Sequence, residues 1–255
     1  MKSTIGLLAV SAALLAGGHV THAEDDATTQ KLKAALEMPH RSAENRARDE
    51  NRDPVDAMRF CRLQANMTVL EFGPGSGWYT EILGPVLQEE GQLFIAYKED
   101  WMTRLDPLLA MPFMSAVQKH PVDISWNSDE RRFDVGAIEY DLPPVDLALN
   151  IREYHNLGEA GARTLNAATF AALKAGGYYC VIDHTRRHME PPYSENRRRA
   201  DPVAVILAVQ EAGFRLIAFS DMFFKPDDEL RYEVGRKTVT GNTDRFALLF
   251  QKPLE

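Results

Sequence analysis

The pattern of apolar and polar residues changes at Asp53-Pro54, where a helix cap is followed by proline at the first helical position. From there, short apolar runs alternate with segments whose apolar residues recur at helical spacing. The apolar runs predict strands at residues 67–72, 92–97, 145–150, 178–183, 214–219 and 245–251, with one more between 121 and 137. The helical segments are 54–63, 78–83, 101–120, 162–173 and 201–212, with a kink or restart expected at Gly84-Pro85.

Strands that alternate with helices predict a parallel sheet covered on both faces. The last two strands have no helix between them, which predicts an antiparallel pair at one edge. We therefore expect an α/β fold in residues 54–255: a Rossmann-like, seven-stranded, mostly parallel sheet with an antiparallel C-terminal strand pair and helices on both faces. Residues 24–53 are polar and charged, and they predict a loose helix followed by an extended arm.

The first 23 residues have the layout of a secretory signal peptide. Lys2 precedes an uncharged run over residues 5–18, and small residues end at Ala23 before the acidic Glu24. The run is shorter than the roughly 20 residues that a membrane-spanning helix needs. We expect cleavage after Ala23 and a periplasmic or secreted protein without a membrane span, with an uncleaved membrane anchor as the alternative.

Charge and cysteine content narrow the possible functions. A net charge of −8 argues against a non-specific nucleic-acid binder. The two cysteines, Cys61 and Cys180, could pair in an oxidising compartment, but the place of Cys180 inside an expected core strand favours buried free thiols. Neither the cysteines nor the histidines are grouped like metal ligands, so no metal site is expected.

The clearest chemical signal is the sequence VLEFGPGSGWYT. An apolar strand carries an acid, Glu71, near its end, and Gly73, Gly75 and Gly77 follow before a helix. Glycine is needed where the backbone turns sharply and a ligand touches main-chain atoms, and the carboxyl end of a strand is where open α/β sheets bind ligands. The spacing is not the G-x-G-x-x-G of dinucleotide sites, because Trp78 stands where the third glycine would fall.

This spacing resembles the E/D-x-G-x-G-x-G motif of class I S-adenosylmethionine-dependent methyltransferases. VDLALN at 145–150, followed by YHNL at 154–157, is similar to the fourth strand of that family and its exit. LKAGGYY at 173–179 resembles the turn before the fifth strand, with Ala175 in place of proline. The resemblance covers roughly residues 54–253, and the lead-in before it looks like that of a group of exported bacterial methyltransferase-like proteins.

The resemblance implies a methyltransferase that binds S-adenosylmethionine and methylates a small-molecule acceptor. The three glycines would line the methionine part of the cofactor, and Glu71 would orient the loop and the amino group. The family's ribose-binding acid is replaced by Tyr97, so Glu99 or Asp100 would have to serve, and the acid near the adenine has the candidates Glu139 and Asp141. The expected cofactor-binding residues are Glu71, Gly73, Gly75, Gly77, Glu99, Asp141 and Asn150.

Candidate catalytic residues follow the fourth and fifth strands: Tyr154, His155, Asp183 and His184. Methyl transfer needs the nucleophile, methyl group and sulfur in line, and a base helps when the nucleophile carries a proton. His155 could act as that base or orient the substrate, and Asp183 or His184 could polarise the acceptor. The alternatives are that Tyr154 and His155 only shape the pocket, and that Asp183 and His184 cap loops.

Two arginine clusters, Arg186-Arg187 and Arg197–Arg199, follow the fifth strand. A basic lid on an acidic protein suggests an anionic acceptor, and a solvated loop held by salt bridges is the alternative.

The expected export of the protein conflicts with its expected cofactor, because S-adenosylmethionine is made in the cytosol and an exported enzyme has no obvious supply of it. Three hypotheses follow: a methyltransferase of the cell envelope, a non-catalytic small-ligand-binding protein on the same fold, or an interaction protein with an empty site. The missing acids at the ribose and adenine positions favour the binding protein. The intact glycine loop favours the methyltransferase, which we take as the expectation.

Overall fold

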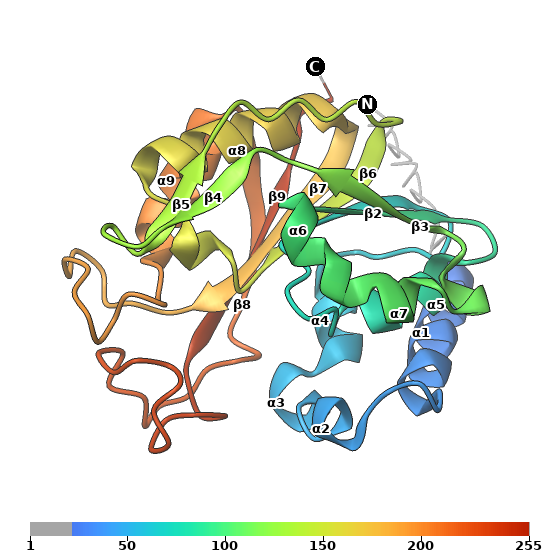
Figure 1. Cartoon of the computed structure of the whole chain (residues 1–255), viewed down its shortest axis with the longest axis horizontal. Helices are drawn as coiled ribbons and strands as arrows, with labels where there is room; N and C mark the ends of the chain where they lie inside the picture. The colour runs from blue at the N-terminus through green and yellow to red at the C-terminus, as the bar shows by residue number, and fades with distance from the viewer. Residues whose placement is uncertain (1–21, 255) are drawn as a thin grey trace, which may run out of the picture.

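The computed structural model describes residues 22–254 (Figure 1). The predicted signal peptide lies outside these residues, apart from His22 and Ala23 at the start of helix α1, His22–Glu37. Between residues 22 and 254, no helix has both the length and the apolar character needed to cross a bilayer.

Seven strands form one sheet in the order β3-β2-β1-β6-β7-β9-β8. They are β1 Thr68–Phe72, β2 Gln92–Tyr97, β3 Val117–Pro121, β6 Val145–Ile151, β7 Leu173–His184, β8 Arg215–Ser220 and β9 Arg245–Gln251. All neighbours are parallel except β9, which runs antiparallel to both β7 and β8. The predicted mostly parallel sheet with an antiparallel C-terminal pair is confirmed.

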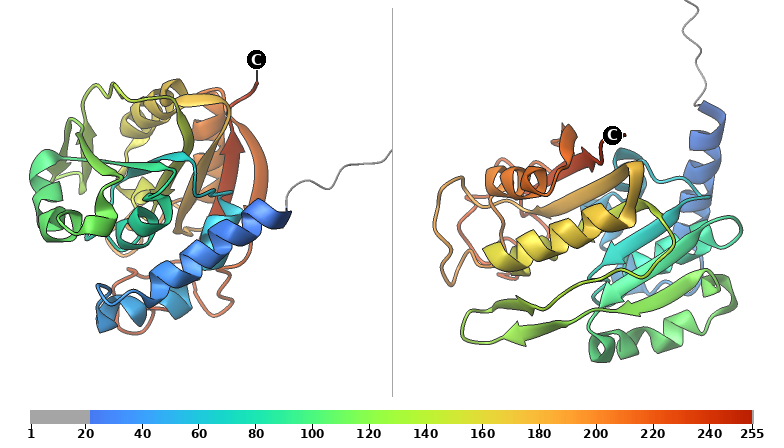
Figure 2. Two further views of the ribbon diagram at one scale, coloured as in Figure 1. Left: turned by 90° about the vertical axis from the view of Figure 1, so that its right-hand side faces the viewer. Right: turned by 90° about the horizontal axis from the view of Figure 1, so that it is seen from above.

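Helices cover both faces of the sheet, as a parallel sheet of apolar strands requires. Helices α4, Pro54–Phe60, and α5, Thr80–Leu87, lie on one side with α1. Helices α8, Glu159–Ala172, and α9, Pro202–Glu211, lie on the other side (Figure 1). Figure 2 shows α1 along the outside of the molecule, where it contacts α5.

The expected extended arm is instead helical and packed against the domain. After α1 come the short helices α2, Ala43–Arg46, and α3, Asp49–Arg52. Arg41, between them and α1, is buried, and its guanidinium donates at 2.7 Å to both Asp49 and Glu81. Because Glu81 belongs to α5, its bond with Arg41 fixes the arm to the core, while the bond to Asp49 holds the arm together.

The expected third strand within residues 121–137 is wrong. The third strand of the sheet is β3, which lies just before this range and pairs with β2 from Leu93 and Val117 onward. Residues 121–137 instead form a separate antiparallel pair, β4 Ile124–Asn127 and β5 Arg132–Val135. β3 is partly exposed along its length, so it lacks the apolar pattern of a central strand.

The expected helical stretch 101–120 is broken into short pieces. They are α6 Glu99–Met102, η1 Thr103–Leu105, α7 Asp106–Leu109 and η2 Pro112–Met114. Prolines stand at the starts of the last two pieces, where they cannot donate the backbone bond that a continuous helix needs.

Helix α5 continues through Pro85, so the helix does not restart there. Proline at this position leaves the carbonyl of Glu81 without its helical N–H partner. The Nε2 atom of His40 lies 2.9 Å from that carbonyl oxygen and hydrogen-bonds to it. The arm therefore compensates for the proline, and the helix continues.

Cys61 and Cys180 form a disulfide, so the expectation of free thiols is wrong. Cys61 caps the end of α4 and Cys180 lies in the middle of β7, and both are fully buried. Their Cα atoms are 5.4 Å apart. Burial was the argument against pairing, yet the end of α4 meets β7 inside the core, so both cysteines are buried and bonded.

Candidate functional site

The glycine loop, residues 73–77, joins β1 to α5 at the carboxyl edge of the sheet. Gly73, Gly75 and Gly77 have φ angles of 69°, 57° and 85°, a region that favours glycine. The loop is held by backbone bonds from Gly73 to Ala96 and from Gly77 to Pro74. A Cβ atom at Gly75 would meet nothing within 4 Å. The loop surface is therefore open at Gly75.

The other two glycines make room for the chain's own side chains. A Cβ at Gly73 would lie 2.4 Å from Cγ of Glu153, and one at Gly77 would lie 2.8 Å from Cδ2 of Leu105. Gly73 and Gly75 border the cavity above the loop, whereas Gly77 does not. The part of the loop that a ligand can reach is thus centred on Gly75.

We call the space above the loop the glycine-loop cavity; its volume is about 250 Å³. Besides the loop, it is lined by Glu153 and His155 after β6, His184 at the end of β7, and Arg52 from the arm. Among the lining residues that the structure describes, the carboxylates are Glu71 and Glu153.

Glu71 lies beneath the loop and is 5 % exposed. The hydroxyl of Thr80 donates to its carboxylate at 2.7 Å. Burial raises the pKa of Glu71 to about 7, although the bond from Thr80 acts in the opposite direction. The loop therefore covers a carboxyl group that changes charge near neutral pH.

His155 and Asp183 meet at the ends of two neighbouring parallel strands, β6 and β7. The Nδ1 atom of His155 lies 2.8 Å from Oδ1 of Asp183. Asp183 is fully buried and also accepts the backbone N–H groups of His155 and His184. A carboxylate at Nδ1 keeps the proton there, which leaves Nε2 of His155 as the proton acceptor. His155 lines the glycine-loop cavity.

The structure separates Tyr154 and Asn150 from the loop. Tyr154 is buried, its hydroxyl accepts a hydrogen bond from Asn166 at 2.9 Å, and burial raises its pKa to about 12. It lines another cavity, of about 610 Å³, between α8 and α9, which His155 also borders. Asn150 is fully buried within β6 and does not line the glycine-loop cavity.

The end of β2, where a ribose-binding acid was expected, carries Tyr97. Its ring packs edge-on against Phe72 and Trp101, with centroids 6.1 and 4.9 Å away, and its hydroxyl donates to Glu153 at 3.2 Å. Glu99 and Asp141 are both exposed, and neither lines the cavity.

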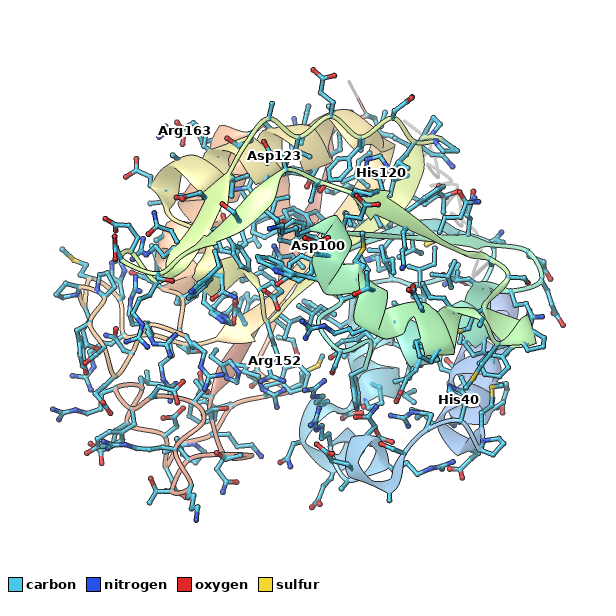
Figure 3. The ribbon with its side chains drawn as sticks, in the orientation of Figure 1. His40, Asp100, His120, Asp123, Arg152 and Arg163 are labelled. Carbon is cyan, nitrogen blue, oxygen red and sulfur yellow. A yellow bond between two sulfur atoms is a disulfide. The ribbon has the colours of Figure 1, made fainter. Side chains whose placement is uncertain are left out.

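Figure 3 places Arg152 between the arm and the loops of the C-terminal half, while Asp100, the neighbour of Glu99, lies on α6. Besides Glu71, the acid that lines the glycine-loop cavity is Glu153, which sequence reasoning missed because it follows β6 instead of β2.

The arginines of the expected lid are mostly engaged within the protein. Arg199 is buried and bonds Asp228 with two N–H groups at 2.8 and 2.9 Å, and Arg198 pairs with Glu233. This favours the salt-bridged loop, the alternative to the lid. The arginines beside the loop include Arg52 and Arg152. The local sequence around Arg152 did not indicate that it would line the cavity, because its position beside the loop depends on the topology of the sheet.

No protein-family model and no curated protein matches the chain. Solved structures do match it. A SAM-dependent methyltransferase from Aquifex aeolicus has a TM-score of 0.58 at 19 % sequence identity, covering 88 % of this chain and 97 % of that chain. The cyclase SpnF has a TM-score of 0.59 at 16 % identity, over 90 % and 94 % of the two chains. Human N-acetylserotonin methyltransferase in complex with SAM has a TM-score of 0.53 at 12 % identity, over 89 % and 56 %.

These similarities establish the fold. The chain has the fold of class I S-adenosylmethionine-dependent methyltransferases, with the same kind of sheet that its sequence predicted. It spans little more than half of the human enzyme. SpnF is named as a cyclase, so function must be argued from the site and not from the fold alone.

Proposed function

We propose that this chain is an exported S-adenosylmethionine-dependent methyltransferase that acts on a small molecule. The observation that carries this proposal is that the open glycine loop, Glu71 and the His155–Asp183 pair meet at one cavity. A ligand resting on Gly75 would share that cavity with a group able to accept a proton. Methyl transfer to a nucleophile that carries a proton needs this combination.

The lining residues fit both parts of the cofactor, with one reassignment. Gly73 and Gly75 present bare main chain to an amino-acid group, and Glu71 beneath them would pair with its ammonium. At the ribose position we assign the carboxylate to Glu153, which Tyr97 holds beside the loop. Burial raises the pKa of Glu153, so hydrogen bonds from ribose hydroxyls would stabilise its charged form.

Bound S-adenosylmethionine would supply an electrophilic methyl group on sulfur. His155 would take the acceptor's proton at Nε2, and Asp183 would stabilise the resulting imidazolium through Nδ1–H. Asp183 is suited to this because two backbone N–H groups hold its carboxylate in place.

The disulfide supports the proposed export. Disulfides persist in oxidising compartments such as the periplasm and are rare in the cytosol. The Cys61–Cys180 bond therefore agrees with the signal peptide predicted for residues 1–23.

Calorimetry and thermal unfolding with S-adenosylmethionine and S-adenosylhomocysteine test the cofactor. At a hundred times its dissociation constant, a ligand that binds the native state alone stabilises it by about 2.7 kcal/mol. Gly75→Ala should abolish binding, because its Cβ would occupy the open space above the loop, where nothing within 4 Å meets it in the free protein. Gly176→Ala is the matched control: its φ of 80° imposes similar strain, and it lies outside the cavity. Equal loss of affinity in both variants would contradict the assignment.

A binding protein without methyl transfer is the second candidate. It is favoured by Tyr97 at the ribose position and by the exposure of Glu99 and Asp141. Incubation with S-adenosylmethionine and a small-molecule extract of bacterial envelopes separates the two. Formation of S-adenosylhomocysteine that His155→Gln removes supports the enzyme, whereas tight cofactor binding without any turnover supports the binding protein.

A further inference from the structure

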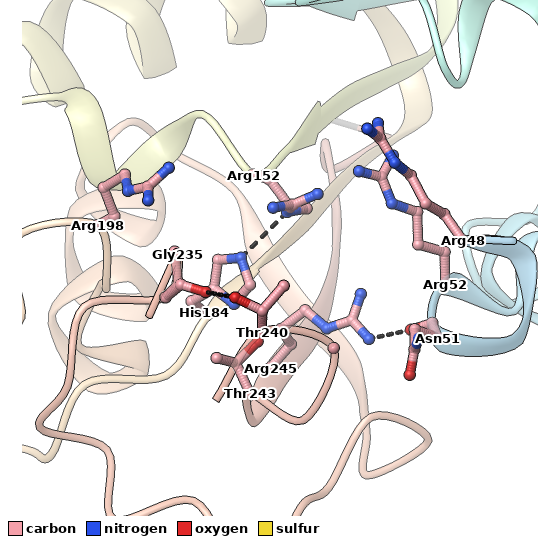
Figure 4. A pocket seen from close by; sticks show the side chains of 12 residues that line it. Arg48, Asn51, Arg52, Arg152, His184, Arg198, Gly235, Thr240, Thr243 and Arg245 are labelled. Atoms are coloured by element: carbon pink, nitrogen blue, oxygen red, sulfur yellow. Dashed lines mark hydrogen bonds between the residues drawn. The ribbon is translucent and has the colours of Figure 1, made fainter. Parts of the chain in front are cut away.

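A second cavity, of about 360 Å³, opens beside the glycine loop, and we call it the arginine cavity (Figure 4). Five guanidinium groups line it: Arg48, Arg52, Arg152, Arg198 and Arg245. They come from α3 and its cap, the segment after β6, the loop after β7, and the start of β9. Residues distant in sequence thus bring positive charge to one small space.

The lining of this cavity has no opposing charge. Its other described residues are Asn51, His184, Val234, Gly235, Thr240, Gly241 and Thr243. Arg48 and Arg198 have carboxylate partners outside the cavity, Glu44 and Glu233.

Arg52, Arg152 and Arg245 form no salt bridge with any residue in the described part of the chain. The guanidinium of Arg52 instead stacks on the Trp78 ring at 4.4 Å, and Arg152 donates to a histidine. Arg245 donates to the backbone carbonyl of Asn51. Three positive charges therefore lack a direct ion-pair partner in that part of the chain, although Asp183 acts on Arg152 and Arg245 from farther away.

The electrostatic cost of this arrangement is visible in the arginines themselves. Burial, followed by repulsion from Arg152, lowers the pKa of Arg52 to about 9. Burial is also the main reason why the pKa of Arg245 falls to about 10, and why that of Arg152 is lowered. Like charges held together away from water are stabilised by an anion that pairs with them.

Two buried donors on the cavity wall also lack partners. His184, 4 % exposed, accepts the Nε–H of Arg152 at its own Nε2. The pKa of His184 is well below its usual value, mainly because of burial, so the ring is neutral and its proton is on Nδ1. That Nδ1 atom and Nε of Arg245, which is 6 % exposed, have no hydrogen-bond partner among the residues that the structure describes.

We propose that the arginine cavity binds the phosphate group of a small phosphate monoester. A phosphate monoester carries up to two negative charges and accepts hydrogen bonds from several directions, which suits guanidinium forks arriving from different chain segments. A monocarboxylate would neutralise one arginine and leave the others unpaired. The chain as a whole carries a net charge of −8, which favours a small molecule over a nucleic acid as the ligand of this cavity.

The position of the cavity connects this ligand to the proposed reaction. Arg52, Arg152, His184, Arg198 and Val234 line both the arginine cavity and the glycine-loop cavity. A molecule whose phosphate binds the arginines would extend toward Gly75 and His155. Its identity as the methyl acceptor rests on the proposed function, whereas its binding does not.

Binding is measured by calorimetry and thermal unfolding on the full, oxidised chain without S-adenosylmethionine. The probes are inorganic phosphate and phenyl phosphate, with succinate and chloride at matched ionic strength. We expect phenyl phosphate to bind at least tenfold more tightly than succinate, and chloride to leave the melting temperature unchanged. Equal binding of succinate, or no binding of either phosphate compound, would overturn the proposal.

Two variants locate the site. Arg52→Gln should weaken phenyl phosphate binding at least tenfold, or about 1.4 kcal/mol. Arg59→Gln is the control, because this exposed arginine of α4 pairs with Asp56 and does not line the cavity. Wild-type affinity in Arg52→Gln would refute the site. Failure to bind S-adenosylmethionine would refute the proposed function alone, because the phosphate measurements do not use it.

Discussion

Glu71 offers the sharpest test of the site, because one substitution isolates the cost of its buried charge. In Glu71→Gln the side chain keeps its shape, and its amide oxygen can still accept the Thr80 hydroxyl bond that the carboxylate accepts at 2.7 Å. What changes is the ability to ionise. We predict that the variant becomes more stable than the wild-type chain as the pH rises above 4.5, and that the two are equally stable below that pH.

The magnitude follows from linkage between protonation and folding. The pKa of Glu71 is about 7 in the folded chain against an ordinary 4.5, so the folded state binds the proton more tightly. Between these values, stability falls as pH rises, because the native state holds more protons than the unfolded state. At about 1.36 kcal/mol per pH unit, the penalty reaches about 3 kcal/mol at pH 8 and vanishes below pH 4.5.

Urea unfolding followed by tryptophan fluorescence at several pH values between 4.5 and 8 measures this difference. Glu89→Gln is the control: Glu89 is exposed and pairs with Lys31 at the surface, so its removal should produce no gain at pH 8. A difference between Glu71→Gln and wild type that stays constant with pH would refute the reasoning. A wild-type chain that is more stable than the variant at pH 8 would refute it equally.

The same carboxyl connects stability to the proposed cofactor. An ammonium group placed against Glu71 would favour its charged form and lower its pKa. Affinity for S-adenosylmethionine should therefore rise as pH increases from 5 to 8, and Glu71→Gln should remove that dependence. Calorimetry in buffers of different ionisation enthalpy would detect the proton that binding releases.

Two further predictions concern the disulfide and the proton acceptor. The Cys61–Cys180 bond spans 119 residues, and chain entropy predicts that the Cys61→Ala/Cys180→Ala double variant loses up to about 5 kcal/mol of unfolding free energy in urea; two reactive thiols in the denatured, unreduced wild type would contradict the bond. His155→Gln should lower methyl transfer by about 10²- to 10⁴-fold while the cofactor's dissociation constant stays within about twofold; a parallel loss of affinity would point to a structural role.

Local signals in the sequence predicted the elements around the glycine loop. The strand that ends next to Gly73 could be predicted because its apolar run leads directly into the glycines. β9 was predicted with its observed bounds because six of its seven residues are buried. The position of β3 was not predicted because its residues are partly exposed and its pairing with β2 depends on the whole sheet. Pro107 and Pro112 stand at the starts of short helices, whereas Pro85 lies inside α5, where His40 bonds the carbonyl that the proline leaves free.

Local signals in the sequence also predicted part of the candidate site. His155 and Asp183 were both identified because each follows a buried strand, and parallel strands end at one edge. Their hydrogen bond could not be predicted, nor could the disulfide, which depends on where the end of α4 packs against β7. Arg245 lies 93 residues after Arg152 in the sequence, and no pattern within either segment shows that both face one cavity.

The two adjoining cavities share Arg52, Arg152 and Arg198 and differ in their carboxyl groups, and that difference constrains the ligand that each could bind. The glycine-loop end offers the carboxyls of Glu71 and Glu153, whereas the arginine cavity has no carboxylate in its described lining. S-adenosylmethionine carries a net positive charge from its sulfonium and ammonium groups, so it suits the first end, and a phosphate ester suits the second. Because the walls are shared, the two ligands would attract each other across Arg152 and His184. This polarity would align an anionic acceptor with the methyl group while His155 stays within reach of the acceptor's proton.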